Sequence, residues 1–161
     1  MYMFRPLRRV QHALDDESAR HLLSIVRRGV LAVTNNEQWP YAVPINFFYD
    51  EKENRILFHG SPSGQKADAI RKDNRVCFTV YQEERIDPLE PWAPYVRSTV
   101  VFGRCSEITD PDEKLRTLRL FAGKYYPDKD SVEEEIKRSG KAVRMYEIRI
   151  EHLCGKEIQE K

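Results

Sequence analysis

The stretch FHGSPSGQKADAIRKDNRVCFTV, residues 58–80, gathers residues suited to holding an anion. Ser61, Ser63, Gly64 and Lys66 fall where a predicted strand gives way to a predicted helix. The first turn of a helix exposes unpaired N–H groups and a partial positive charge, and small residues let an anion approach them. Serine hydroxyls can donate to phosphate oxygens, and a lysine adds a full charge. The pattern indicates a phosphate-binding loop, although a polar turn with a solvated lysine fits it equally well.

The spacing of these residues excludes two familiar phosphate motifs. Gln65 separates Gly64 from Lys66, and Ala67 follows, so the loop lacks the adjacent Gly-Lys and the Ser or Thr of a Walker A motif. The chain also lacks a Gly-x-Gly-x-x-Gly fingerprint, so a Rossmann dinucleotide site is not expected. A phosphate bound here would belong to another kind of ligand.

His59 lies at the edge of the same loop, next to Gly60. Its imidazole could donate to a phosphate, to a ring carbonyl or to a substrate atom. A purely structural role is the more common alternative for a single histidine. The other histidines and the cysteines show no metal-ligand spacing, so no metal site is expected.

Pro44 interrupts YAVPINFFY, residues 41–49, which otherwise has the composition of a strong strand. Because proline cannot donate to a neighbouring strand, the backbone here could face a ligand. An edge position with the missing N–H toward solvent is the more common explanation. Nearby aromatic residues could line a flat ring, although aromatics more often belong to a core. They are Phe47, Phe48, Tyr49, Trp92 and Tyr95.

Strands must position most of these residues. Short segments rich in apolar and β-branched residues follow one another with turn-like residues between them, beginning with three that are typical of an antiparallel meander. A bend is expected at Gly103, within the longest segment. The segments are residues 29–35, 41–49, 55–60, 75–81, 95–108 and 143–150.

The first predicted helix has acidic residues in its first turn, Arg27 and Arg28 in its last, and ends at Gly29. The second covers residues 64–74, and the last two begin at residues whose side chains can cap them. Evenly spaced strands with few helices favour a small closed or nearly closed β-barrel with peripheral helices. The expected capping pairs of the last two helices are Asp110 with Glu113 and Ser131 with Glu134.

Length and composition favour one soluble domain over residues 1–161, with 40% hydrophobic residues. With 27 Lys and Arg against 26 Asp and Glu, neither nucleic acid nor a membrane is an expected partner. The N-terminus lacks the apolar region of a secretory signal, and no segment has the length of a membrane span. The three widely spaced cysteines imply no disulfide framework, so a cytoplasmic location is expected.

Taken together, four segments resemble the FMN-binding split-barrel superfamily of pyridoxamine 5'-phosphate oxidase, most closely its nitroimidazole-resistance branch. Their order and spacing span nearly the whole chain, which is more specific than any single motif. The closing stretch EIRIEHLCGKE resembles the family's terminal strand. The four segments are the N-terminal helix with GVLAVT, then YAVPINFFYD, LFHGSPSGQKADAIRKDNRVCFTV and YVRSTVVFGRCSEITDPDEK.

The resemblance implies a mainly β fold, a six-stranded antiparallel split barrel with peripheral helices, which forms a homodimer with FMN between its subunits. It also implies the cofactor contacts. Val43, Pro44, Ile45 and Asn46 would run along the isoalloxazine ring, His59, Gly60, Ser61, Gly64, Gln65 and Lys66 would hold the phosphate and ribityl chain, and Ser98 and Thr99 would approach the ring from its other side. The family usually has histidine where this chain has Gln65, so a role for a titratable proton at that position does not carry over.

The function implied is that of an FMN-dependent, nitroreductase-like oxidoreductase. Electrons would pass from reduced nicotinamide, NAD(P)H, through FMN to a small aromatic acceptor, with His59 as the catalytic candidate. The flavin itself carries out the difficult chemistry. The alternative is a non-catalytic flavin-binding or haem-binding protein that serves as a redox sensor or carrier.

Overall fold

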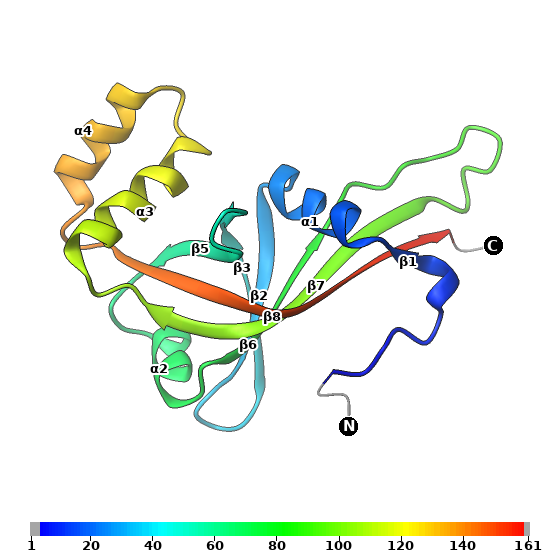
Figure 1. The fold of residues 1–161 in the computed structure, drawn as a ribbon, viewed down its shortest axis with the longest axis horizontal. Coiled ribbons are helices and arrows are strands. Elements are labelled where there is room, and N and C mark those ends of the chain that lie inside the picture. The colour runs from blue at the N-terminus through cyan, green and yellow to red at the C-terminus, as the bar shows by residue number, and fades with distance from the viewer. Residues whose placement is uncertain (1–3, 160–161) are drawn as a thin grey trace.

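A curled antiparallel sheet dominates the computed structural model, which describes residues 4–159 (Figure 1). The sheet has eight strands where six were expected, while the split-barrel class itself is confirmed. The short β1 (Ala13–Leu14) pairs with β8 outside the main order. That order is β3 (Pro40–Asn46), β2 (Arg28–Thr34), β6 (Arg75–Tyr81), β7 (Tyr95–Glu107), β8 (Arg144–Gln159), β5 (Arg55–Gly60) and β4 (Phe48–Asp50).

The expected single strand over residues 41–49 is wrong, because the chain changes edges at Phe47. The segment before this residue forms β3 at one end of the sheet, and the segment after it forms β4 at the other. Phe47 is fully buried. Its N–H donates to the Tyr125 hydroxyl at 2.8 Å, and its carbonyl accepts from that hydroxyl at 2.7 Å. A tyrosine from a turn distant in the sequence therefore satisfies the backbone where the ladder is interrupted.

The two edges of the sheet approach each other without closing the barrel. β3 and β5 lie close together, but no ladder of hydrogen bonds joins them in the strand order. β4 covers β5 only from Arg55 to Leu57, so His59 and Gly60 lie beyond its end. The split in the barrel is therefore bordered by the end of β3 on one side and the end of β5 on the other.

The helices start largely where the capping residues predict. Asp110 accepts from Glu113 N at 2.8 Å, which confirms the expected cap. Asp15 caps the first helix by accepting from Ser18 N at 2.7 Å. The expected end of that helix at Gly29 is wrong, because the helix ends at Ile25, and Arg28 and Gly29 pair in β2. The cap expected at Ser131 is wrong, because Asp128 accepts from its N–H and an aspartate three residues earlier is an equally good cap. The elements are the 3₁₀ turn η1 (Val10–His12), α1 (Asp16–Ile25), α2 (Gln65–Lys72), α3 (Pro111–Gly123) and α4 (Lys129–Ser139).

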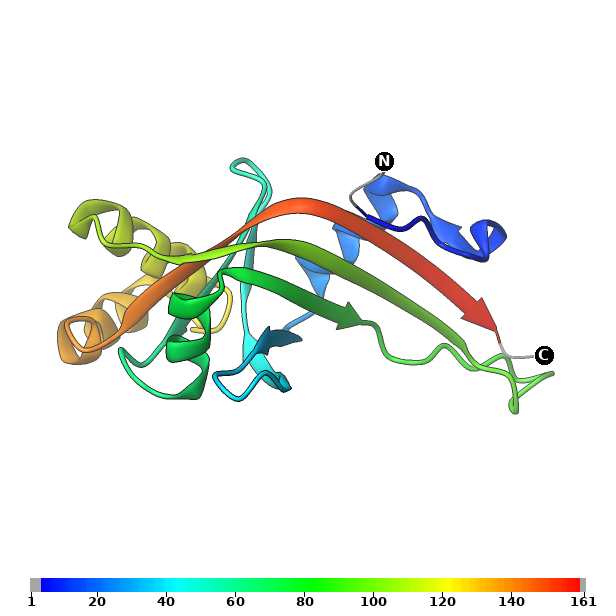
Figure 2. The same ribbon diagram turned by 90° about the horizontal axis from the view of Figure 1, so that it is seen from below.

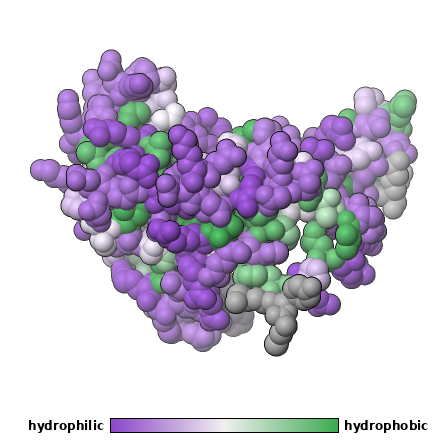
Figure 3. Space-filling view, in the orientation of Figure 1, coloured by the Kyte–Doolittle hydropathy of each residue, from purple (hydrophilic) through white to green (hydrophobic). Residues whose placement is uncertain are grey.

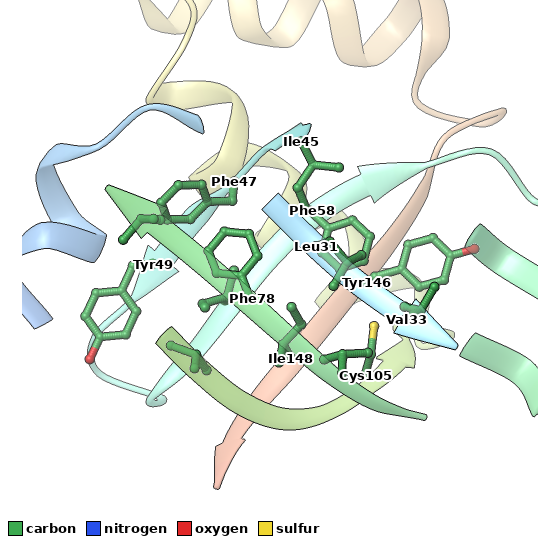
Figure 4. Packing of buried hydrophobic residues seen from close by; sticks show 14 of the residues in the cluster. Leu31, Val33, Ile45, Phe47, Tyr49, Phe58, Phe78, Cys105, Tyr146 and Ile148 are labelled. Atoms are coloured by element: carbon green, nitrogen blue, oxygen red, sulfur yellow. The ribbon is translucent and has the colours of Figure 1, made fainter. Parts of the chain in front are cut away.

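The main core fills the inside of the half-barrel (Figure 4). Phe47 meets Phe78 edge-on at 4.9 Å between ring centroids, and Phe58 stacks on Tyr146 at 5.1 Å. The expected bend at Gly103 is present as a register shift in the β7–β8 pairing. A Cβ at Gly103 would lie 2.3 Å from the Arg149 carbonyl oxygen, so only glycine fits there.

A second core lies on the outer face of the sheet, under α3 and α4. It contains Leu57, Ile108, Leu118, Phe121 and Met145. In Figure 2, β7 and β8 run side by side along the molecule, with these helices at one end and the loop after β6 at the other. The helices therefore cover only one end of the outer face.

The visible surface in Figure 3 is mostly hydrophilic, with hydrophobic patches toward its middle and right-hand side. Several large apolar side chains are exposed, including Trp39, Leu89 and Trp92. In the part of the chain that is described, no helix is long and apolar enough to cross a membrane.

Candidate functional site at the split of the barrel

The loop between β5 and α2 presents unpaired N–H groups, as the sequence predicts. The first intrahelical hydrogen bond runs from Asp68 N to Gly64 O at 3.0 Å, which leaves the N–H groups of residues 65–67 without a partner inside the helix. Gly64 has φ 112°, a left-handed conformation suited to glycine, and a Cβ there would meet no atom within 4 Å. The Tyr146 hydroxyl donates to the Ser61 carbonyl at 3.2 Å and fixes the start of the loop.

Lys66 places a half-buried ammonium group behind this loop. Its Nζ lies 5.3 Å from the centroid of the Phe58 ring and 3.6 Å from the position that a Cβ would take at Gly60. Burial lowers the pKa of Lys66, and the nearby Cys105 opposes this effect. Among residues 4–159, no carboxylate and no hydrogen-bond acceptor contacts the ammonium. An ammonium group whose nearest partner is the face of an aromatic ring can still bind an anion.

His59 lies at the end of β5, edge-on to Phe121 with 4.9 Å between ring centroids. Much of its surface is exposed, yet the protein crowds one side of the imidazole. That burial, and then the charge of Lys66, lower the pKa of His59. The neutral ring can donate from one nitrogen and accept at the other. Within the described chain, neither nitrogen has a hydrogen-bond partner.

The structure brings His59 together with Asn46 in one cavity of about 370 Å³. Asn46 ends β3, across the split from β5, and its Oδ1 accepts from Arg28 Nε at 3.2 Å. The remaining walls come from α3, α4 and the turns that follow them, and include Phe121 and Tyr125. Sequence reasoning missed both of these aromatic residues. The signal available was the pair of aromatic residues one helical turn apart, which is equally typical of a buried helix face.

The other residues predicted to contact the flavin ring lie on opposite faces of the sheet. Val43 and Ile45 pack toward the main core, whereas Pro44 between them is exposed. Thr99 is fully buried, and its hydroxyl donates to the Ala19 carbonyl at 2.8 Å. Ser98 lies on the opposite face, paired with Tyr81 and Lys156. The location of Pro44 on β3 places it on an edge strand, where the missing N–H is tolerated.

Pro44 also belongs to a shallow depression on the outer face of the sheet. Arg28 and Tyr81 line this depression with it. Asn46 pairs with Arg28 and Ser98 pairs with Tyr81, so these predicted contacts border the same outer face. Lys66 lines neither this depression nor the cavity that contains His59.

Comparison with known proteins gives a match to one family model. Residues 15–157 match the model described as pyridoxamine 5'-phosphate oxidase. No curated protein sequence shows significant similarity to the chain.

Several solved structures share the fold at low sequence identity. A candidate 5-nitroimidazole antibiotic resistance protein from Bacteroides thetaiotaomicron has a TM-score of 0.77 at 20% identity, covering 91% of this chain and 87% of that one. A FAD-binding protein from Mesorhizobium loti has a TM-score of 0.67 at 20% identity, covering 90% and 96%. The flavocytochrome Anf3 from Azotobacter vinelandii has a TM-score of 0.71 at 19% identity, covering 98% and 73%.

Proposed function

Since the chain belongs to the pyridoxamine 5'-phosphate oxidase family, whose model matches residues 15–157, we propose that it binds FMN and uses it in electron transfer. Two proteins of similar fold, described as a FAD-binding protein and a flavocytochrome, support a flavin as the cofactor. The observation that carries the proposal is the Lys66 ammonium, which is half-buried behind a glycine-containing loop and has no counter-ion in the described chain. An anionic phosphate would compensate it.

The residues at the start of α2 fit the phosphate end of the flavin. The N–H groups of residues 65–67 and the Lys66 ammonium would donate to phosphate oxygens, and Gly60 and Gly64 leave room for the ligand. Gln65 is exposed and would add a neutral donor. Ser61 would contribute its exposed hydroxyl to the phosphate and ribityl region.

The ring end of the flavin would lie along β3 and the outer face of the sheet. Pro44, Asn46 and Ser98 present side chains on that face. Val43, Ile45 and Thr99 point into the core, so any contact from them would come through their backbone atoms. We propose this division of roles among the predicted cofactor contacts.

We further propose that the protein forms a homodimer through the uncovered part of the outer face. Strand register aligns two rows of side chains, none of them Asp, Glu, Lys or Arg, across five strands of this face. All are half-buried or exposed in the single chain, where Phe4 stacks on Phe102 and His152 in the second row. A second copy would bury them. The rows are Pro44, Val30, Thr79, Val100 and Cys154, and Ala42, Ala32, Cys77, Phe102 and His152.

The proposed reaction passes electrons from reduced nicotinamide to a small aromatic acceptor. When bound, the flavin would supply the hydride and electron transfer. The protein would orient its ring, and His59, neutral near pH 7, would contact the acceptor by a hydrogen bond as the catalytic candidate. The three cysteines are free thiols, which suits the cytoplasmic location that we propose.

Replacement of Lys66 tests the phosphate site. Lys66→Ala should raise the dissociation constant for FMN at least about tenfold, because a hydrogen bond to a charged group contributes about 1.5–3 kcal/mol. Lys72→Ala is the matched control, since Lys72 lies on the same helix but is exposed and donates to the Asn36 carbonyl. Both constants are measured by the quenching of flavin fluorescence. An unchanged constant for Lys66→Ala would remove Lys66 from the phosphate site.

Two measurements on the protein purified without added ligand test the function as a whole. The absorption spectrum and the mass of the released cofactor should identify FMN, and a haem spectrum would contradict the proposal. Consumption of NADH or NADPH with a nitroaromatic acceptor should exceed that of free FMN at equal concentration. Bound FMN without such turnover would indicate a flavin-binding sensor or carrier instead.

A further inference from the structure

The cavity that contains His59 and Asn46 is built by one chain, between the ends of β3 and β5 and the helix pair α3–α4. Its volume of about 370 Å³ falls at the small end of the range of roughly 300–1,000 Å³ found for sites that hold small organic molecules. The size therefore suits a ligand of one or two fused rings.

Aromatic and aliphatic side chains form most of its wall. Phe121 on α3 and Tyr125, in the turn just after this helix, contact each other with 5.1 Å between ring centroids. Ile136 on α4 and Val143, just before β8, add aliphatic surface. The Tyr125 hydroxyl is already engaged with the backbone of Phe47, so its ring is what the residue offers to a ligand. Flat apolar walls favour a planar ring.

Two polar side chains of the cavity, His59 and Asn46, are at the split of the barrel. The His59 imidazole has no hydrogen-bond partner among the described residues, and neither does the NH₂ group of Asn46. One group can donate or accept and the other can donate. Both would otherwise rely on water, so a ligand that carries hydrogen-bonding atoms at one edge gains two partners here.

The charges around the cavity exclude a charged ligand. Glu135 is the carboxylate in its lining, and it already forms an ion pair with Arg138. The Arg27 guanidinium lies over the Tyr125 ring, 5.0 Å from its centroid, and does not line the cavity. A charged ligand would lose its hydration without finding a free counter-ion.

We propose that this cavity binds a small, uncharged, planar heteroaromatic molecule, with its ring against Phe121 and Tyr125 and its heteroatoms at His59 and Asn46. As the place of the electron acceptor, this site rests on the proposed function. As a binding site it does not, because α3, α4 and the two strand ends form it without a cofactor.

Benzimidazole is a suitable probe, because it is uncharged at pH 7.5, bicyclic, and carries one donor and one acceptor nitrogen. Its binding to the purified protein is measured by calorimetry and by saturation-transfer NMR, with and without added FMN. Benzoate and benzylamine, which are similar in size but charged, should bind at least tenfold more weakly.

Ser139→Trp should block the cavity from α4, since Ser139 lines it. The dissociation constant for benzimidazole should rise at least tenfold, while circular dichroism and FMN retention stay as in the wild type. Lys137→Trp is the matched control, because Lys137 is exposed on the same helix and does not line the cavity. Ser139→Leu is a smaller substitution at the same place, to be used if the tryptophan variant does not fold.

The outcomes separate this proposal from the proposed function. Benzimidazole binding without FMN binding would refute the flavin function and leave the cavity site standing. FMN binding without benzimidazole binding would overturn the cavity site alone. Equal benzimidazole affinity in the wild type and in a folded Ser139 variant would also overturn it.

Discussion

Lys66 and Lys124 are both half-buried lysines, but their ammonium groups have different partners in the protein. The Lys124 ammonium donates to the Val26 carbonyl at 2.6 Å and lies 4.1 Å from the centroid of the Phe47 ring. It therefore ties the end of α3 to the backbone that follows α1. Lys66 has only the more distant face of the Phe58 ring. The structural lysine has an acceptor in the protein, and the proposed binding lysine has none among the described residues.

The environment of Lys124 predicts a pH dependence of stability. Burial, and then the charge of Arg27, lower the pKa of Lys124 from 10.5 to about 8. Between these values the unfolded chain holds the proton more tightly than the folded one, so the free energy of unfolding should rise with pH in this window. The difference in this free energy between wild type and Lys124→Met should therefore shift in favour of the wild type from pH 7.5 to pH 9.5. Urea unfolding at both values measures it.

The control for this experiment is Lys72→Met, since Lys72 is exposed and its contact is with the Asn36 carbonyl. The difference in the free energy of unfolding between Lys72→Met and the wild type should stay constant between the two pH values. A constant difference for Lys124→Met as well would show that Lys124 titrates near its ordinary pKa.

At the scale of elements, a buried arginine holds α3, which forms one wall of the cavity that contains His59, against the sheet. Arg55 on β5 is 4% exposed and donates to Asp50 on β4, Glu147 on β8 and Glu113 on α3, at 3.2, 2.7 and 2.7 Å. Glu113 also lies in the first turn of α3, where the helix dipole favours a carboxylate. One guanidinium thus joins three strands and a helix.

Removal of this arginine should be costly. Arg55→Ala takes from the buried Asp50 and Glu147 the guanidinium that both contact. Glu147 keeps Arg149 at 2.9 Å and Asp50 keeps Arg116 at 4.0 Å. The loss should therefore be about 3 kcal/mol, the lower end of the range for breaking a buried ion pair. Arg119→Ala is the control, because Arg119 is exposed on α3 and its ion pair with Glu133 lies on the surface, so its removal should cost much less. Chemical denaturation of both variants gives the comparison, and equal losses would mean that Arg55 does not fix α3.

At the scale of the whole molecule, the helices leave most of the outer face of the sheet uncovered. The two rows of side chains described above cross β3, β2, β6, β7 and the second half of β8. Sheet faces of this kind are usually covered by another layer. A second copy of the chain is the layer that we propose.

A charge in the middle of this face should therefore produce a monomer. Val100→Asp, or Ala32→Glu as a second variant, would bury a carboxylate against the partner. Light scattering should show a dimer for the wild type and a monomer for these variants, with FMN affinity reduced in parallel. Lys137→Glu, on the exposed side of α4, should remain dimeric. A wild-type monomer with full FMN occupancy would contradict the proposed interface.

The amino-acid sequence alone determined those features that depend on near neighbours along the chain. The strand from Arg55 to Gly60, the cap at Asp110 and the bend at Gly103 were all predicted, because apolar periodicity, capping and the absence of a side chain act over a few residues. The resemblance added the family and the split-barrel class, since it used the order of segments along the whole chain.

Only the tertiary structure decided which residues meet. The change of edges at Phe47, the satisfaction of its backbone by Tyr125, and the meeting of Asn46 with His59 under α3 and α4 all join segments distant in sequence. Tertiary structure also decided that Ser98 lies on the outer face of the sheet and Thr99 on the inner face. These outcomes depend on strand register and on how far the sheet curls, and both are fixed by packing across the whole molecule rather than by local preference.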